Sequence, residues 1–165
     1  MTDTPAPHPS PEAVCAHMFA ADQLNASIRI SHRLGHRQRR RRAEIARAVG
    51  AGRATLEMTV RDDMLNGHEI CHGGFITTLA DSAFAFACNS NNQATVAAGL
   101  TVDFLAPAQR GDVLIAEATE VTRSGRNGVY DMVVRDQNGK RIALVRGRSV
   151  ALAGRTVIPI DGASA

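Results

Sequence analysis

The sequence predicts an α+β fold in which a curved antiparallel β-sheet wraps around one central, buried helix. The stretch from Phe75 to Cys88 is apolar on nearly every face and has the length of a helix, so protein must surround it. The segments that follow have the pattern of strands with no helix between them, which favours antiparallel pairing. Such a sheet can bury the helix only by curling around it.

The length and composition are typical of one globular domain, with 165 residues, 44% of them hydrophobic and 21% charged. We expect this domain at residues 12–160, between a disordered tail at 1–11 and a short tail at 161–165. Four of the six prolines fall within the first eleven residues, as is common in disordered segments.

We expect a cytoplasmic protein with no membrane partner. The longest apolar stretch, Gly73 to Cys88, is interrupted by Asp81 and is shorter than the about 20 residues that a bilayer requires. The N-terminal segment MTDTPAPHPSPEA has neither the basic start nor the apolar core of a signal peptide. The three cysteines are an odd number without a C-x-x-C pair, which argues against a disulfide framework.

The remaining elements follow from local patterns. Proline suits the first position of a helix, so a helix is predicted from Ser10 or Pro11, with apolar residues at helical spacing: Val14, Met18, Phe19 and Leu24. From Arg53 the pattern alternates as in a half-buried strand, with one apolar face: Ala54, Leu56, Met58 and Val60. A meander of three or four strands is predicted after the buried helix, at 93–106, 112–122, 129–136 and 141–152, with an Asn138-Gly139 hairpin turn before the last.

The net charge of +3 comes from one segment. Arg29 to Arg47 contains 8 arginines and one glutamate, so the rest of the chain has 11 basic and 15 acidic residues, a balance of −4. Residues 25–42 have weak periodicity, and no structure is predicted there. The segment is either a solvated basic excursion or a contact for phosphate or nucleic acid. We favour the first reading and predict no nucleic-acid partner.

Residues 66–74 read NGHEICHGG and contain a match to the H-E-x-x-H zinc-protease pattern. That pattern requires two histidines one turn apart on a continuous helix. Here the turn signals Asn66-Gly67 and Gly73-Gly74 bracket the match, and glycine costs about 1 kcal/mol inside a helix. His72 is also the last histidine of the chain, so no later one can serve as a third ligand. We predict no metal and no cofactor.

The same glycines suggest a different chemistry. A Gly73-Gly74 pair at the start of a buried helix presents backbone N–H groups at the positive end of the helix dipole, which is the geometry of an oxyanion hole. Asp81 is the one ionisable residue between Gly73 and Cys88, and burying an unpaired carboxylate costs several kcal/mol. We therefore prefer an Asp81 that lines a cleft to a structural one with dedicated partners. Thr77 and Thr78 could share its face in support.

Four motifs carry a resemblance to a known family: MLNGHEICHGGFITTLADSAFAFACNS, TVDFLAPAQRGD, SGRNGVYD and ALVRGRS. In order and spacing they closely resemble the phenylacetate-pathway acyl-CoA thioesterases of the hotdog-fold superfamily, from about Val49 to Ile158. The resemblance implies a hotdog fold, a homodimer or a homotetramer built as a dimer of dimers, and active sites at the subunit interface. The basic segment at 25–42 has no counterpart in the family.

The resemblance also implies roles for single residues. Asp81 matches the catalytic carboxylate, which acts as a general base toward water or as a nucleophile. The Gly73 N–H matches the oxyanion donor, and the Asn66 side chain matches the residue that orients water or the acyl group. His72 and Gly74 complete the supporting turn.

Coenzyme A carries phosphates, so basic groups are expected at the mouth of the site. The candidates lie in family motifs: Arg126, Arg146, Arg148 and Ser149. Alternatively, each of these arginines is an exposed residue of a strand and binds no ligand. Phenylalanines could line an acyl pocket or pack in the core: Phe84, Phe86 and Phe104.

The predicted function is hydrolysis of (hydroxy)phenylacetyl-CoA-type thioesters, with acyl-CoA as the substrate partner. Three other readings stay open. A non-catalytic acyl-CoA-binding module would not need Asp81, a hotdog enoyl-CoA hydratase would pair a catalytic histidine with its acid, and a nucleic-acid binder would use Arg37 to Arg42.

Overall fold

The computed structural model describes residues 8–22, 31–32 and 49–160. Its elements, in chain order, are α1 (Pro11–Ala21), β1 (Ser31–His32), β2 (Arg53–Thr59), a 3-10 helix η1 (Asp62–Met64), α3 (Gly73–Asn89), β3 (Gln93–Phe104), β4 (Val113–Ser124), β5 (Asn127–Arg135) and β6 (Arg141–Thr156).

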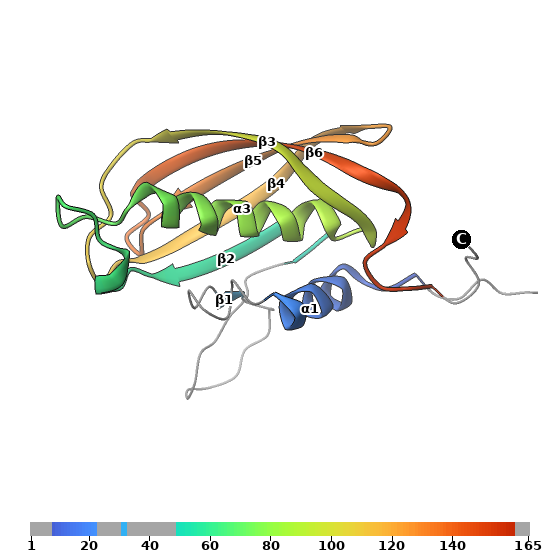
Figure 1. Cartoon of the computed structure of the whole chain (residues 1–165), viewed down its shortest axis with the longest axis horizontal. Coiled ribbons are helices and arrows are strands. Elements are labelled where there is room, and N and C mark those ends of the chain that lie inside the picture. Colours follow the sequence, from blue (N-terminus) through green and yellow to red (C-terminus); the bar gives the residue numbers. More distant parts are fainter. Residues whose placement is uncertain (1–7, 23–30, 33–48, 161–165) are drawn as a thin grey trace, which may run out of the picture.

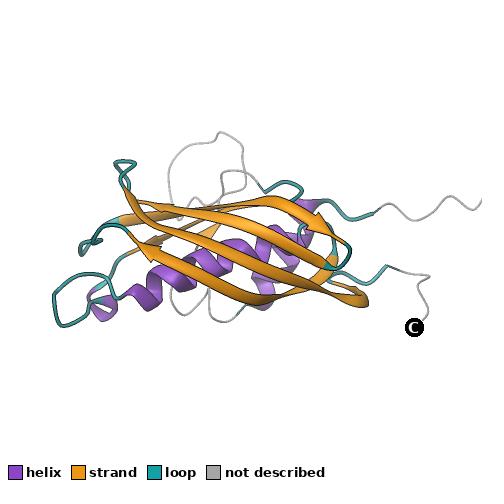
Figure 2. Ribbon diagram, turned by 90° about the horizontal axis from the view of Figure 1, so that it is seen from above, coloured by secondary structure: helices purple, strands orange, loops and turns teal. Residues whose placement is uncertain are grey.

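The strands form one antiparallel sheet in the order β1-β2-β4-β5-β6-β3. The sheet curves over α3, which lies along its concave side (Figure 1) and is covered by the strands when seen from above (Figure 2). The predicted curved sheet around a central helix is therefore confirmed. The meander consists of β4, β5 and β6, and Gly139 takes a φ of +85° in the hairpin predicted at Asn138-Gly139.

β3 occupies a place that local patterns could not predict. It pairs with β6 and not with β4, the next strand in the chain, so that Phe104 stands opposite Ala143 and Val102 opposite Val145. β3 has no second neighbour among the described strands, and this leaves a twelve-residue edge.

The core lies between α3 and the concave face of the sheet. Ala54, Leu56 and Met58 on β2 are buried, as the alternation predicts, and they belong to the same hydrophobic cluster as α3. Phe84 of α3 packs against Tyr130 of β5, with ring centroids 5.3 Å apart. On the other side of α3, α1 contributes Phe19, whose ring centroid is 6.2 Å from that of Phe86.

Gly147 makes the closest approach between β6 and α3. A methyl group at this position would lie 2.9 Å from Cε1 of Phe84, which is buried and has no room to move. We expect Gly147→Ala to lower the free energy of unfolding by about 1–3 kcal/mol through overpacking. Gly50→Ala is the matched control, because nothing lies within 4 Å of its added methyl group. Equal denaturant midpoints for the two variants would contradict this packing.

The helix predicted from Ser10 or Pro11 is confirmed. α1 begins at Pro11, and the Ser10 side chain accepts a hydrogen bond from the Ala13 N–H at 3.3 Å and caps the helix. β1 lies inside the segment 25–42, for which no structure was predicted, and pairs with β2. The remainder of that segment, with Arg37 to Arg42, lies outside the described residues, as does Leu24.

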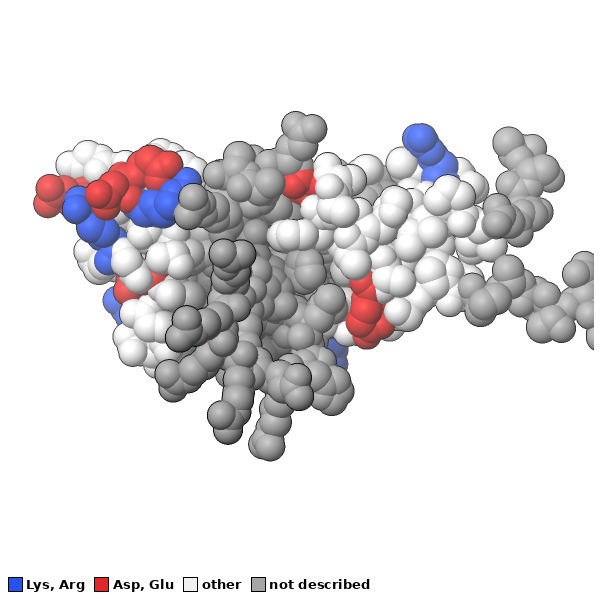
Figure 3. Space-filling model, turned by 90° about the horizontal axis from the view of Figure 1, so that it is seen from below, with Lys and Arg blue, Asp and Glu red and all other residues white. Residues whose placement is uncertain are grey.

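On the face seen in Figure 3, the described Lys and Arg side chains are few, and at one end of the molecule they lie beside Asp and Glu. Two ion pairs at and near the 3-10 helix place opposite charges side by side. Arg61 pairs with Asp63 at 2.9 Å, and Arg110 pairs with Asp62 at 3.1 Å. None of the helices in residues 8–22 and 49–160 has the length and apolar character needed to cross a bilayer.

Candidate active site

The residues of the zinc-protease match form a turn and not a helix. The Asn66 side-chain oxygen accepts a hydrogen bond from the His68 N–H at 2.9 Å, and the Asn66 N–H donates to the Ile70 carbonyl at 2.9 Å. Glu69 takes a φ of +58°, outside the helical region. Since α3 begins only after His72, the two histidines do not share a helical face.

The first turn of α3 is held by side chains, which offsets the poor helix propensity of two glycines. His72 is the N-cap, and its Nδ1 accepts a hydrogen bond from the Gly74 N–H at 2.9 Å. The hydroxyls of Thr77 and Thr78 donate to the carbonyls of Gly73 and Gly74, each at 2.8 Å. The two threonines thus stabilise the first turn of α3. Because each hydroxyl already donates its hydrogen bond to a carbonyl of that turn, neither donates to Asp81.

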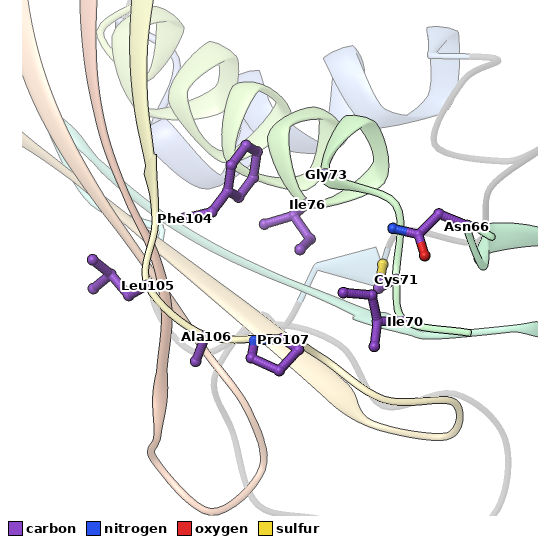
Figure 4. Close-up of a pocket in the computed structure, with 9 residues that line it drawn as sticks. All are labelled: Asn66, Ile70, Cys71, Gly73, Ile76, Phe104, Leu105, Ala106 and Pro107. Carbon is purple, nitrogen blue, oxygen red and sulfur yellow. The ribbon is translucent and has the colours of Figure 1, made fainter. Parts of the chain in front are cut away.

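The start of α3 opens into a cavity of about 490 Å³. Both Gly73 and Asn66 line it. In the described part of the chain, nothing accepts a hydrogen bond from the Gly73 N–H. The Asn66 oxygen is held by the His68 N–H, and the amide nitrogen is turned toward the cavity (Figure 4). The cavity therefore presents two hydrogen-bond donors at the positive end of a helix.

Asp81 lies in the middle of α3, half-buried. Burial raises the pKa of its carboxyl above the usual value of 3.8, and no described residue donates a hydrogen bond to it. It does not line the cavity. Eight residues separate it from Gly73, which is about 12 Å along a helix axis. A single chain therefore does not bring this carboxylate to the Gly73 N–H.

The raised pKa of Asp81 has a consequence for stability. The folded state binds a proton more readily than the unfolded state, so this residue lowers stability as the pH rises from 3.8 through the raised pKa. We expect Asp81→Asn to raise the melting temperature at pH 7.5, with a smaller gain at pH 5. Asp131→Asn should have the opposite sign, because the Arg146 guanidinium holds the pKa of Asp131 below its usual value. An unchanged melting temperature for Asp81→Asn at pH 7.5 would contradict this account.

The rest of the cavity wall is mostly apolar: Ile70, Cys71, Ile76, Phe104, Leu105, Ala106 and Pro107. Of the three phenylalanines considered for an acyl pocket, only Phe104 lies here, while Phe84 and Phe86 are 1% and 2% exposed in the core. Burial raises the pKa of the Cys71 thiol to about 11. The thiol is therefore protonated at neutral pH and unsuited to nucleophilic attack.

The predicted CoA-binding residues lie elsewhere. Arg126 is exposed between β4 and β5, and Arg146 and Arg148 are exposed on β6. Because β6 alternates and its intervening residues are buried on the helix side, both β6 arginines face away from α3. The Arg146 guanidinium donates two hydrogen bonds to the Asp131 carboxylate, both at 2.7 Å. Ser149 is buried on the inner face. One chain does not bring these residues to the cavity.

Known proteins are similar to this chain in sequence. A family model described as the thioesterase superfamily matches residues 68–143. The acyl-coenzyme A thioesterase PaaI of Escherichia coli is 48% identical over 107 residues, which make up 65% of this chain and 76% of that protein. This chain belongs to the thioesterase superfamily. A putative esterase of Archaeoglobus fulgidus is 40% identical over 96 residues, 58% of this chain and 62% of that protein.

Solved structures of thioesterase relatives have the same fold. The structure of the E. coli PaaI protein from the phenylacetic acid degradation operon has a TM-score of 0.77 and 36% identity, over 87% of this chain and 94% of that one. A variant of the phenylacetic acid degradation protein PaaI from Thermus thermophilus has a TM-score of 0.61 and 37% identity, over 64% and 88%. The hotdog fold that the sequence motifs implied is confirmed.

Proposed function

We propose that this thioesterase-family protein hydrolyses acyl-coenzyme A thioesters to a free acid and coenzyme A. One observation carries the proposal: a mostly apolar cavity is lined both by Gly73, whose N–H has no acceptor among the described residues, and by Asn66, whose amide nitrogen is turned toward it. Two donors placed around a carbonyl oxygen stabilise the negative charge that develops there during attack. The relative named acyl-coenzyme A thioesterase PaaI supports the same chemistry.

The proposed reaction uses one carboxylate. Asp81 takes a proton from water, and the water oxygen attacks the thioester carbonyl carbon while the carbonyl oxygen is held by Gly73 and Asn66. The tetrahedral intermediate then collapses, the C–S bond breaks, and the thiolate of coenzyme A leaves and is protonated. In the alternative route, the Asp81 carboxylate attacks the carbonyl carbon itself, the C–S bond breaks and the coenzyme A thiolate leaves and is protonated. Water then hydrolyses the resulting anhydride, which releases the acid and restores the Asp81 carboxylate. Both routes need the same three residues.

We propose that the site is assembled from two copies of the chain, so that Asp81 of one copy faces Gly73 of the other. The separation of about 12 Å along α3 supports this, because it is too long for one water molecule to bridge. Gly74, Thr78, Asp81 and Ala85 also form an exposed or half-exposed stripe along α3, and after Asp81 the other residues of the helix are buried. The β3 edge carries exposed apolar side chains, with Phe104 at its end 55% exposed and Leu105 directly after it 51% exposed, and edges of this length are commonly covered. A dimer, or a tetramer made of two dimers, would cover both surfaces.

The phosphates of coenzyme A remain assigned to Arg126, Arg146, Arg148 and Ser149. Arg126 and Arg148 form no ion pair within the described residues, so both are available to an anion. Arg146 would have to share its guanidinium with Asp131. We propose aryl acyl groups of the phenylacetyl type as substrates, on the basis of the operon in which the E. coli relative is named.

Release of free thiol from a panel of aryl and alkyl CoA thioesters tests the proposed function. We expect turnover with at least one aryl thioester. Binding without turnover across the panel would favour a non-catalytic acyl-CoA module. Addition of water to an enoyl-CoA without thiol release would favour a hydratase.

A further inference from the structure

One contact joins the start of α3 to the end of β3. The ring of Phe104 lies against the α-carbon of Gly73, so closely that a methyl group on Gly73 would be 2.7 Å from Cζ and 3.1 Å from Cε2. Both residues line the cavity, and the Phe104 ring is directed toward the first turn of the helix (Figure 4). The proposed oxyanion donor and an aromatic side chain are therefore immediate neighbours.

Core packing does not account for this ring. Phe104 is 55% exposed, whereas Phe84 and Phe86 are almost fully buried. Among the described residues of the cavity wall, the remaining side chains are aliphatic apart from Asn66 and the thiol of Cys71, so Phe104 is the one aromatic residue of that set. A carbonyl that accepts from the Gly73 N–H lies next to this ring, so the acyl carbons bonded to it can pack against Phe104.

We propose that Phe104 is the residue that determines which acyl groups the site accepts, and that it favours an aryl group close to the carbonyl over a straight alkyl chain. This inference rests on the proposed thioesterase function. Two aromatic rings attract each other in offset or edge-to-face arrangements beyond the effect of buried area alone. An alkyl chain gains the burial but not this additional attraction.

The first test measures selectivity. The ratio of kcat/KM for phenylacetyl-CoA to that for hexanoyl-CoA is compared in the wild-type protein and in Phe104→Leu, which keeps an apolar side chain but removes the ring. We expect the ratio to fall about three- to tenfold. Phe75→Leu is the matched control. Phe75 lies in the first turn of α3, close to Gly73, but it packs on the core and does not line the cavity. Its ratio should stay within about twofold of the wild-type value.

The second test uses the contact itself. Gly73 does not have a positive φ, and the three atoms nearest to the methyl group of an alanine there all belong to the Phe104 ring, which the methyl group must displace. We expect Gly73→Ala to lower kcat/KM for phenylacetyl-CoA about tenfold in the wild-type background and less than about threefold in Phe104→Ala. Equal losses in both backgrounds would show that the ring has no part in the effect of the methyl group and would overturn the inference.

The outcomes also separate this inference from the proposed function. If the wild-type protein releases thiol from no thioester in the panel, the proposed function fails, and the inference fails with it. If the wild-type protein is active and Phe104→Leu keeps the wild-type selectivity ratio, only the inference is overturned. Circular dichroism and melting temperature establish that each variant is folded before rates are compared.

Discussion

Replacing Asp81 with asparagine is expected to lower kcat by about 10²- to 10⁴-fold while the protein stays folded and still binds acyl-CoA. Asparagine has nearly the same shape, but it cannot take a proton from water or attack a carbonyl. Asp81 has no described partner to lose, so the substitution breaks no hydrogen bond of the fold. The loss should therefore appear in kcat, with little change in the affinity for a non-hydrolysable CoA thioether.

Glu12→Gln provides the control for this experiment, because it removes an exposed carboxylate from α1 and should leave kcat unchanged. The melting temperature gives a second, independent test: the same Asp81→Asn protein should melt at a higher temperature than the wild-type protein at neutral pH. A kcat within tenfold of the wild-type value would contradict a catalytic role for Asp81.

Removing the Gly73 N–H is expected to lower kcat/KM by about 10²- to 10³-fold, which is the usual effect of losing one oxyanion donor. Proline has no backbone N–H and is well tolerated at the first position of a helix. The preceding residue, His72, has φ −63° and ψ 132°, an extended conformation that suits a residue before proline. Gly73→Pro should therefore delete the donor without unfolding the helix.

The Phe104 ring complicates this substitution, because any side chain at position 73 meets it. We therefore compare Gly73→Pro with Gly73→Ala, both in a Phe104→Ala background, where the two proteins differ mainly in the presence of the N–H. Equal values of kcat/KM for these two proteins would exclude the Gly73 N–H from the mechanism.

Local sequence patterns predicted those parts of the fold that depend on neighbours in the chain. The period of two on β2, the apolar run of α3 and the Asn138-Gly139 turn all appear where the pattern placed them. The position of β3 beside β6 depends on contacts between residues that are far apart in the chain, from Phe104 with Ala143 to Gln93 with Thr156, and no local pattern contains that information.

Local spacing also bears on the candidate site. Gly73 and Asn66 are seven residues apart and line one cavity, whereas the distance of about 12 Å from Gly73 to Asp81 follows from their spacing along one helix. The orientation of Arg146 and Arg148 was also present in the sequence, because the alternation along β6 places both on the face opposite Val145 and Gly147. The placement of Phe104 at the cavity and of Phe84 in the core needed the folded structure, since composition does not distinguish the two residues.

Complementation between inactive variants tests whether two copies of the chain share one site. Asp81→Asn and Gly73→Pro are produced together with different affinity tags, and oligomers that carry both tags are isolated. If Asp81 of one copy serves Gly73 of the other, one of the two sites in a mixed dimer has both groups intact. The mixed dimer should then recover about half of the wild-type rate of thiol release. If both groups act within one chain, every site lacks one of them, and a mixed dimer as inactive as its parents would contradict the account.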